Sequence, residues 1–125
     1  MKGKIIILLL LIYVCPVFAG KPYIEFKIKN YNFGNIDFRR DSISIARFVF
    51  KNKGEGVLVV QNVETSCGCT TVDWTKCPLQ ENESGEIIVK FNNKGIKGFF
   101  IKRIFVKSNA ENSITLLKIE GNVSP

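Results

Sequence analysis

Hydrophobic and polar residues alternate with a period of two along most of the chain, and short segments rich in Asn, Gly and Lys interrupt the alternation. Over residues 23–29, for example, Ile24, Phe26 and Ile28 fall on one face and charged residues fall on the other. Such alternation is typical of β-strands with one buried face, and the apolar residues show no helical spacing. The pattern predicts strands over residues 23–29, 43–51, 57–63, 70–74, 86–91, 99–107 and 114–123.

The interrupting segments carry turn signals. Residues 52–56 and 92–95 combine Asn, Lys and Gly, residues 108–112 separate the last two strands, and Gly34 indicates a bend before Ile36. Seven or eight short strands with turns about every 8–12 residues favour an antiparallel β-sandwich of the immunoglobulin-like type. A small closed barrel is the alternative architecture. Because no repeat or linker interrupts the pattern, we expect the sandwich to be one domain, residues 20–125.

The start of the chain has the pattern of a secretion signal. A short basic segment precedes an unbroken apolar run of ten residues, and Val17 and Ala19 occupy the small-residue positions of a cleavage site. The run is shorter than the about 20 residues that cross a bilayer. We therefore expect a signal peptide, residues 1–19, and export to the periplasm or cell envelope of a bacterium. The protein would be held on a membrane only if Cys15 were lipidated.

The composition excludes several kinds of chemistry. The chain contains no His, which excludes a Ser-His-Asp triad, a Cys-His dyad and the usual haem and HExxH zinc motifs. The net charge is +7, but the lysines fall mostly at polar strand positions, as on a solvated face. No nucleic-acid-binding motif is visible. We therefore expect no nucleic-acid partner, no cofactor and no enzymatic activity.

Three cysteines, Cys67, Cys69 and Cys77, lie within eleven residues of the chain. In an exported protein, where disulfides persist, they allow one disulfide and one free thiol. A bond from Cys77 to Cys67 or Cys69 would close an ordinary loop beneath Trp74, whereas a Cys67–Cys69 bond would close a very small ring. Our first interpretation is a structural brace for the loop at Trp74. The alternative is a thiol-based redox or soft-metal site at Cys67-Gly68-Cys69.

The Phe-rich strand near the end of the chain predicts a second candidate site. If its even-numbered apolar residues face the core, the alternation places three others outside, namely Phe99, Ile101 and Phe105. An earlier strand leaves Ile45 and Val49 outside in the same way. Exposed apolar residues on adjoining strands would form a surface for a partner protein. We expect that partner to be another protein of the cell envelope.

Several short motifs follow one another over nearly the whole of residues 20–125. They are Phe-Gly-Asn-Ile at 33–36, Phe-Val-Phe-Lys-Asn-Lys-Gly at 48–54, Ser-Cys-Gly-Cys-Thr at 66–70, Pro-Leu at 78–79, Gly-Glu-Ile at 85–87, Gly-x-Phe-x-Lys-x-Ile-x-Val-x-Ser-Asn at 98–109 and Gly-Asn-Val at 121–123. In this order they resemble the secreted bacterial immunoglobulin-like family called domain of unknown function 1573. The resemblance implies the fold and the exported location. The family has no established activity, so it implies no mechanism.

The chain departs from the family pattern at three places. Glu81 and Asn82 stand in a turn where the family usually has Pro-Gly, and because Asn tolerates a positive φ we expect the turn to persist. Arg40 stands where the family often has Gly, and Cys77 is not part of the family signature. The sequence therefore predicts a non-enzymatic exported module that acts by protein contact, with thiol chemistry as the alternative.

Overall fold

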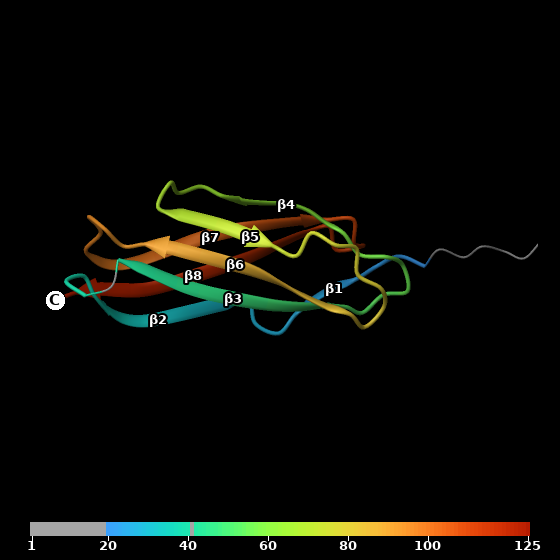
Figure 1. Ribbon diagram of the computed structural model, residues 1–125, viewed down its shortest axis with the longest axis horizontal. Coiled ribbons are helices and arrows are strands. Elements are labelled where there is room, and N and C mark those ends of the chain that lie inside the picture. Colours follow the sequence, from blue (N-terminus) through green and yellow to red (C-terminus); the bar gives the residue numbers. More distant parts are fainter. Residues whose placement is uncertain (1–19, 41) are drawn as a thin grey trace, which may run out of the picture.

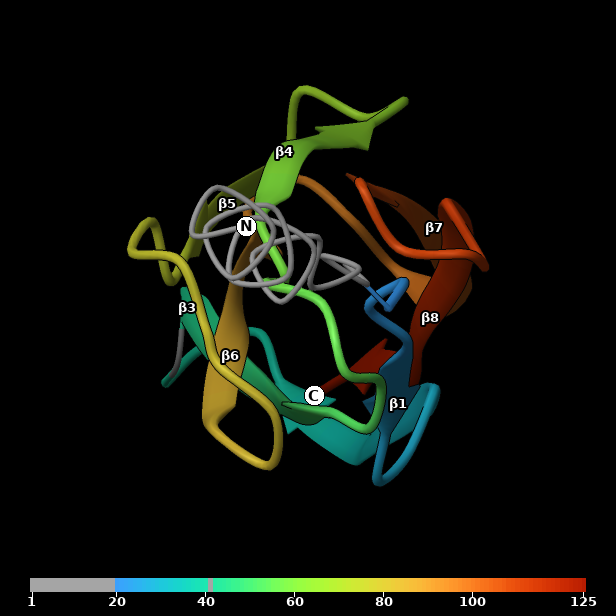
Figure 2. The ribbon, with the colours of Figure 1, turned by 90° about the vertical axis from the view of Figure 1, so that its right-hand side faces the viewer.

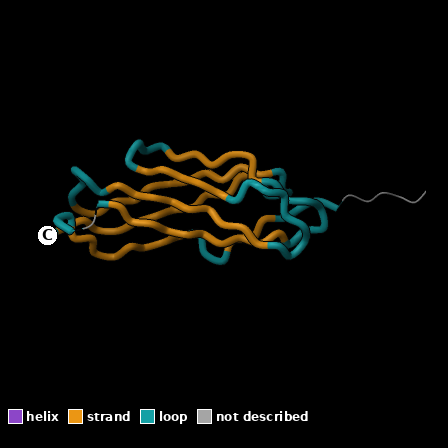
Figure 3. The backbone as a smooth tube through the Cα atoms, viewed as in Figure 1, coloured by secondary structure: helices purple, strands orange, loops and turns teal. Residues whose placement is uncertain are grey.

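The computed structural model describes residues 20–40 and 42–125, and these form an all-β fold (Figures 1 and 3). The predicted signal peptide and Cys15 lie outside the described residues. Within them, no helix is long and apolar enough to cross a membrane. The strands are β1 (Ile24–Phe26), β2 (Asn30–Asp37), β3 (Ile43–Asn52), β4 (Val60–Thr65), β5 (Thr70–Trp74), β6 (Ser84–Asn92), β7 (Gly98–Ser108) and β8 (Ile114–Ser124).

The strands form two four-stranded sheets with the orders β1-β3-β6-β5 and β2-β8-β7-β4. Figure 2 looks along the sandwich and shows β3, β5 and β6 on one side and β7 and β8 on the other. The predicted β-sandwich is therefore confirmed, and the sheets do not close into the alternative barrel. All strand pairs are antiparallel except β2 with β8, which is parallel.

The parallel pair arises because the predicted strand over residues 23–29 is divided between the two sheets. The chain pairs with β3 as far as Phe26, crosses to the other sheet, and continues as β2 in the same direction as β8. The prediction that Ile28 faces the core is consequently wrong, since Ile28 lies in the crossover and is exposed. The predicted bend at Gly34 is a register shift within β2, where Gly34 has a φ of 71°.

The core lies between the two sheets, where the inward residues of both meet. Its largest fully buried side chains include Phe48, Phe50, Phe91, Ile87, Ile104, Leu117 and Ile119. Phe91 of β6 and Phe100 of β7 stack across the sandwich with ring centroids 4.2 Å apart. Complete burial of such side chains contributes roughly 1.5–3 kcal/mol each, so this layer supplies the main stabilisation of the fold.

A buried amide holds together the end of the sandwich at which residue 20 lies. Asn52, at the end of β3, is fully buried. Its Nδ2 donates to the carbonyls of Gly56 and Leu79 at 2.7 and 3.0 Å, and its Oδ1 accepts from the amides of Tyr23 and Gly54 at 3.3 and 3.0 Å. One side chain thereby satisfies backbone groups in three separate segments of the chain, as a buried polar group requires.

Candidate functional site

The first candidate site is the turn between β4 and β5, which carries Cys67, Gly68 and Cys69. Because β4 and β5 are edge strands of different sheets, this turn is the corner at which the chain passes from one sheet to the other (Figure 1). A disulfide joins Cys67 to Cys69, whose Cα atoms are 5.2 Å apart. Of the three pairings open from the sequence, the chain therefore adopts the one that closes the smallest ring.

Cys77 takes no part in this bond and is free and exposed. β5 separates it from Cys69, and five extended residues span roughly 16 Å, well beyond the reach of a disulfide. The interpretation of the cysteines as a brace for the loop at Trp74 is therefore wrong. That loop is held without them by the Lys76 ammonium, 4.0 Å from the Trp74 ring centroid, and by hydrogen bonds of Thr75 to Glu86.

Hydrogen bonds hold the backbone of the cysteine turn. The amide of Cys67 donates to Thr65 Oγ1 at 3.3 Å, and the carbonyl of Cys67 accepts from the amide of Thr70 at 3.2 Å. The carbonyl of Cys69 accepts from the amide of Asn92, the last residue of β6, at 2.8 Å. The corner is thus attached to both adjoining strands and to β6 by bonds that do not involve the sulfurs.

The disulfide itself ties together only near neighbours in the chain. The loop-entropy relation gives about 1.6 kcal/mol for a closed loop of three residues, compared with about 3 kcal/mol for one of fifteen. Both cysteines are half-buried, and Gly68 between them is exposed, with open space where a Cβ would stand. The arrangement is a half-buried disulfide on a backbone that hydrogen bonds also hold.

The second candidate site is the outer face of the sheet that contains β7. As predicted, Phe99 and Phe105 point outward and are 65% and 42% exposed, while Ile101 is half-buried. Two residues that were not predicted belong to the same face: Leu116 of β8 pairs directly with Phe105, and Ile114 lies two residues before Leu116 on the same strand. They are 46% and 58% exposed. We call Phe99, Ile101, Phe105, Ile114 and Leu116 together the apolar face.

The signal for the missed residues was present in the last strand. Within Ile114-Thr115-Leu116-Leu117, alternation about the inward Leu117 places Ile114 and Leu116 on the outside. Directly paired residues in a sheet bring their Cβ atoms within about 5 Å of each other. Phe105 and Leu116 therefore form one continuous exposed apolar patch across two strands.

The expectation that Ile45 and Val49 share this surface is wrong. Both do point outward from β3, and Ile45 is 48% exposed. However, β3 and β7 belong to different sheets, so their outward side chains face opposite sides of the sandwich. On the β3 side the apolar residues are separated by charged ones, with Arg47 paired to Glu86 at 2.8 Å. The two outer faces are therefore separate surfaces.

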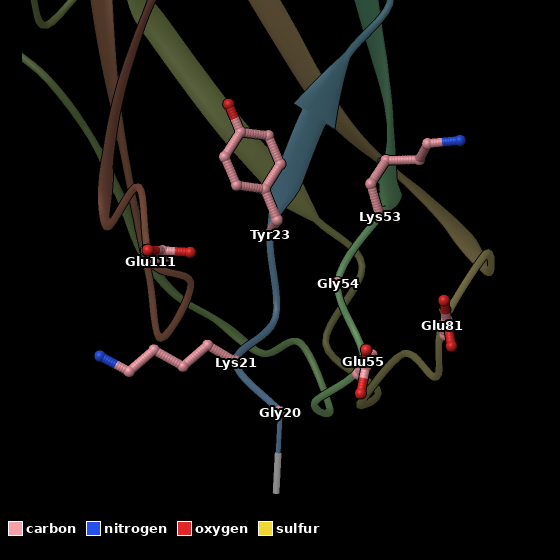
Figure 4. Close-up of a pocket in the computed structure, with 8 residues that line it drawn as sticks. All are labelled: Gly20, Lys21, Tyr23, Lys53, Gly54, Glu55, Glu81 and Glu111. Atoms are coloured by element: carbon pink, nitrogen blue, oxygen red, sulfur yellow. The ribbon is translucent and has the colours of Figure 1, made fainter.

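A hollow of about 430 Å³ lies at the end of the sandwich held by Asn52. Figure 4 shows that it is lined by Gly20, Lys21, Tyr23, Lys53, Gly54, Glu55, Glu81 and Glu111. Its charged side chains have both signs. Among the described residues, no group of three or more His, Cys, Asp or Glu side chains is placed to hold a metal ion. The hollow therefore offers no recognisable ligand chemistry.

The carboxylates with a perturbed pKa lie away from both candidate sites. Hydrogen bonds from the Lys76 ammonium and the Trp74 amide lower the pKa of Asp73. Hydrogen bonds from the amide and side chain of Arg39 lower the pKa of Asp37 in the same way. Both carboxylates simply remain ionised beside cations, so neither is poised as a general acid or base.

Comparisons with known proteins agree with this architecture. A family model described as protein of unknown function (DUF1573) matches residues 24–123. A protein of unknown function from Porphyromonas gingivalis W83 has a similar structure, with a TM-score of 0.73 and 14% identity over 86% of this chain. This chain covers 50% of that protein, so it spans half of its length.

Two proteases of Vibrio cholerae, the secreted serine protease VesC and the protease VesB, contain a similar fold. This chain covers 24% of the serine protease VesC, with a TM-score of 0.59 and 10% identity over 82% of this chain. It covers 32% of the protease VesB, with a TM-score of 0.57 and 12% identity over 82% of this chain. At these identities the likeness shows the fold alone. No curated protein sequence matches the chain.

Proposed function

The chain belongs to the family of proteins of unknown function DUF1573, and from that premise we propose that it is an exported, non-enzymatic immunoglobulin-like module that binds another protein of the bacterial cell envelope. The observation that supports the proposal is the apolar face. Phe105 and Leu116 stand directly opposite each other on β7 and β8, and both are more than two-fifths exposed. Contiguous exposed apolar patches mark sites of protein contact.

The surroundings of the patch indicate the chemistry of its partner. Arg103 and Lys107 lie on the same face of β7 as Phe105, because alternate residues of a strand share a face. In the register of β7 and β8, Arg103 lies directly opposite Lys118. Acidic residues border the same surface, because Glu64 of β4 pairs with Phe105 and Glu120 of β8 pairs with Ile101. A partner with an apolar centre and a rim that carries both signs of charge would complement this surface, since the centres of interfaces are apolar and their charged rims guide association.

The proposal is tested by placing charge on the patch. We expect the double variant Phe105→Lys/Leu116→Lys to lose a crosslinked partner that the wild-type protein captures in the exported fraction of its native host. The expected loss is about tenfold or more, because two central apolar contacts are replaced by buried charges. Quantitative mass spectrometry of the crosslinked material measures it.

A matched control exists on the opposite sheet. Ile45 of β3 is exposed to a similar extent, and Ile45→Lys adds a charge without touching the apolar face. We expect this variant to capture the same partner at the wild-type level. Equal capture by wild type, control and double variant, with unchanged thermal stability in all three, would contradict the proposal.

A second candidate function is thiol chemistry at Cys67-Gly68-Cys69. The observation that favours it is the bond between the two cysteines themselves, on a corner whose backbone is already held by hydrogen bonds. A soft-metal site is the weaker form of this candidate. Reduction would supply two thiolates, but Cys77 lies beyond β5 and is too far along the chain to complete the ligand set.

A further inference from the structure

The cysteine corner is built so that its shape does not depend on its disulfide. The Cys67 and Cys69 carbonyls accept hydrogen bonds from Thr70 and Asn92, and the Cys67 amide donates to Thr65. Reduction of the bond would leave these contacts in place. The two sulfurs would then remain neighbours, held by the backbone rather than by each other.

We propose that the Cys67–Cys69 disulfide exchanges with a dithiol of another exported protein, and that the first new bond forms at Cys67. The inference rests on the second candidate function and specifies its substrate class. Cys69 packs against the hydrophobic core, whereas Cys67 does not. An incoming thiolate must approach one sulfur from the side opposite its bonded neighbour, and the sulfur that is free of core contacts offers that approach.

The leaving sulfurs have donors nearby. When Cys67 is attacked, Cys69 leaves as a thiolate, and the Thr70 hydroxyl lies 3.7 Å from its Sγ and is able to donate to it. When Cys67 later leaves in turn, its Sγ accepts the amide N–H of Cys69, which lies 3.3 Å away in the oxidised protein. Hydrogen bonds to a thiolate lower its pKa and make it a better leaving group.

The exchange is balanced in two steps. The first thiolate of the partner bonds to Cys67 Sγ, the Cys67–Cys69 bond breaks, and the Cys69 thiolate takes the electron pair and then a proton from water. The second thiolate of the partner attacks the partner's own first sulfur, the mixed disulfide breaks, and Cys67 leaves as a thiolate. Cys67 then takes up the second proton. The two protons replace those that the partner thiols released to water on ionising, so the disulfide gains two electrons and two protons and the partner dithiol becomes a disulfide.

The same geometry selects a dithiol over a monothiol. After the first step Cys69 stands beside the mixed disulfide at Cys67, because the hydrogen-bonded turn keeps the two residues together. Its effective concentration there is high, so it expels a single incoming thiol and restores the original bond. Only a partner that carries its own second thiol completes the transfer before this reversal.

The test compares two reductants on the folded, oxidised protein in a Cys77→Ser background, which removes the exposed free thiol. Dithiothreitol and glutathione are supplied at equal thiol concentration without denaturant, and the new thiols are alkylated and counted by mass. Because dithiothreitol is the stronger reductant of any disulfide, a linear cystine peptide is treated in parallel, and we expect the preference for dithiothreitol over glutathione to be about tenfold larger for the protein than for the peptide. An equal preference in protein and peptide would overturn the dithiol inference and leave the second candidate function standing. Reduction only after unfolding in urea would overturn both.

The role of Cys67 is tested with two single variants in the same background. Each is reduced, exposed to glutathione disulfide and analysed for the mixed disulfide over time. We expect Cys69→Ser, which retains Cys67, to form the adduct about tenfold faster than Cys67→Ser, since the retained sulfur differs in its accessibility. Equal rates, or a faster reaction at Cys69, would overturn the assignment of Cys67 as the attacked sulfur.

Discussion

Two turns at opposite ends of the sandwich are stabilised in contrasting ways. The turn over residues 52–56 has no covalent link, yet Asn52 connects it by hydrogen bonds to Tyr23 and Leu79, which lie 29 and 27 residues away along the chain. The turn between β4 and β5 has a covalent link, but the disulfide joins residues separated by two positions. The hydrogen bonds of Asn52 therefore connect distant parts of the chain, whereas the disulfide connects near neighbours.

The contrast shows that a disulfide is not always the part of a small exported domain that holds it together. Long-range contacts restrict the folded chain most, whereas closing a very small loop removes little entropy from the unfolded chain. We therefore expect the buried amide of Asn52 to contribute more to the stability of the fold than the disulfide does. The cysteine pair is then available for thiol–disulfide exchange. The variants below separate these roles, beginning with the largest expected effect.

The strongest test of the comparison is Asn52→Ala. The substitution removes four hydrogen bonds, three of them partly buried. It leaves the Gly56 carbonyl and two backbone amides without this partner, whereas the Leu79 carbonyl keeps its hydrogen bond from the Leu58 amide at 2.8 Å. We expect a loss of about 3 kcal/mol in the free energy of unfolding, because each backbone group that loses its partner costs roughly 1 kcal/mol. Urea unfolding followed by circular dichroism measures it.

The control for that test is the double variant Cys67→Ser/Cys69→Ser. By the loop-entropy relation it loses only about 1.6 kcal/mol. If the cysteine variant were destabilised more than Asn52→Ala, the ranking of the two turns would be reversed and the disulfide would be the main structural element.

A pair of glycine substitutions tests the same comparison between the two turns, with an expected change in stability of intermediate size. A Cβ on Gly56, in the turn held by Asn52, would lie 2.1 Å from the carbonyl oxygen of Gly20, so the backbone would have to shift. A Cβ on Gly68, in the cysteine turn, would meet nothing within 4 Å. We expect Gly56→Ala to lose about 2 kcal/mol, as overpacking does, and Gly68→Ala to change stability by less than about 1 kcal/mol. Thermal unfolding of the two variants measures both losses of stability. Equal losses would contradict the expected difference between the two turns.

Most of the fold could be predicted from the period-two alternation, because the period identifies the buried face of each strand. It does not identify the sheet to which a strand belongs. For that reason the outward direction of Ile45 and Phe105 was predicted correctly, while their placement on one surface was not. Ile28 was missed for a related reason, since the chain changes sheets just before it.

Turn chemistry was a reliable guide where it concerned a single residue. Asn82 stands in a turn that needs a left-handed residue, and it adopts a φ of 68°, as its tolerance of that conformation predicts. The disulfide could be predicted only in part. The predicted strand over residues 70–74 separates Cys69 from Cys77 by more than a disulfide spans, which excludes that pairing but leaves Cys67–Cys69 and Cys67–Cys77 open. The roles of buried amides such as Asn52 were not visible, because they depend on contacts between distant segments.

The smallest predicted effect concerns the pH dependence of stability. Hydrogen bonds from Lys76 and the Trp74 amide lower the pKa of Asp73 below its usual value in the folded protein. A carboxyl with a lowered folded pKa contributes stability above its ordinary pKa, and the contribution is lost as the pH falls through the lowered value. The Asn52 amide does not titrate, so the stability it provides is independent of pH.

We therefore expect Asp73→Asn to differ from wild type by a small amount near neutral pH, and the difference to shrink as the pH falls through the lowered pKa of the wild-type carboxylate. The salt bridge to Lys76 is well exposed, so the effect at neutral pH is slight and declines with added salt. Asn52→Ala, in contrast, should differ from wild type by the same amount at every pH. Urea midpoints measured from neutral to acidic pH compare the three proteins. A difference for Asp73→Asn that grows on acidification would contradict the lowered pKa, and a pH-dependent loss for Asn52→Ala would show that the uncharged amide is not what holds its end of the sandwich.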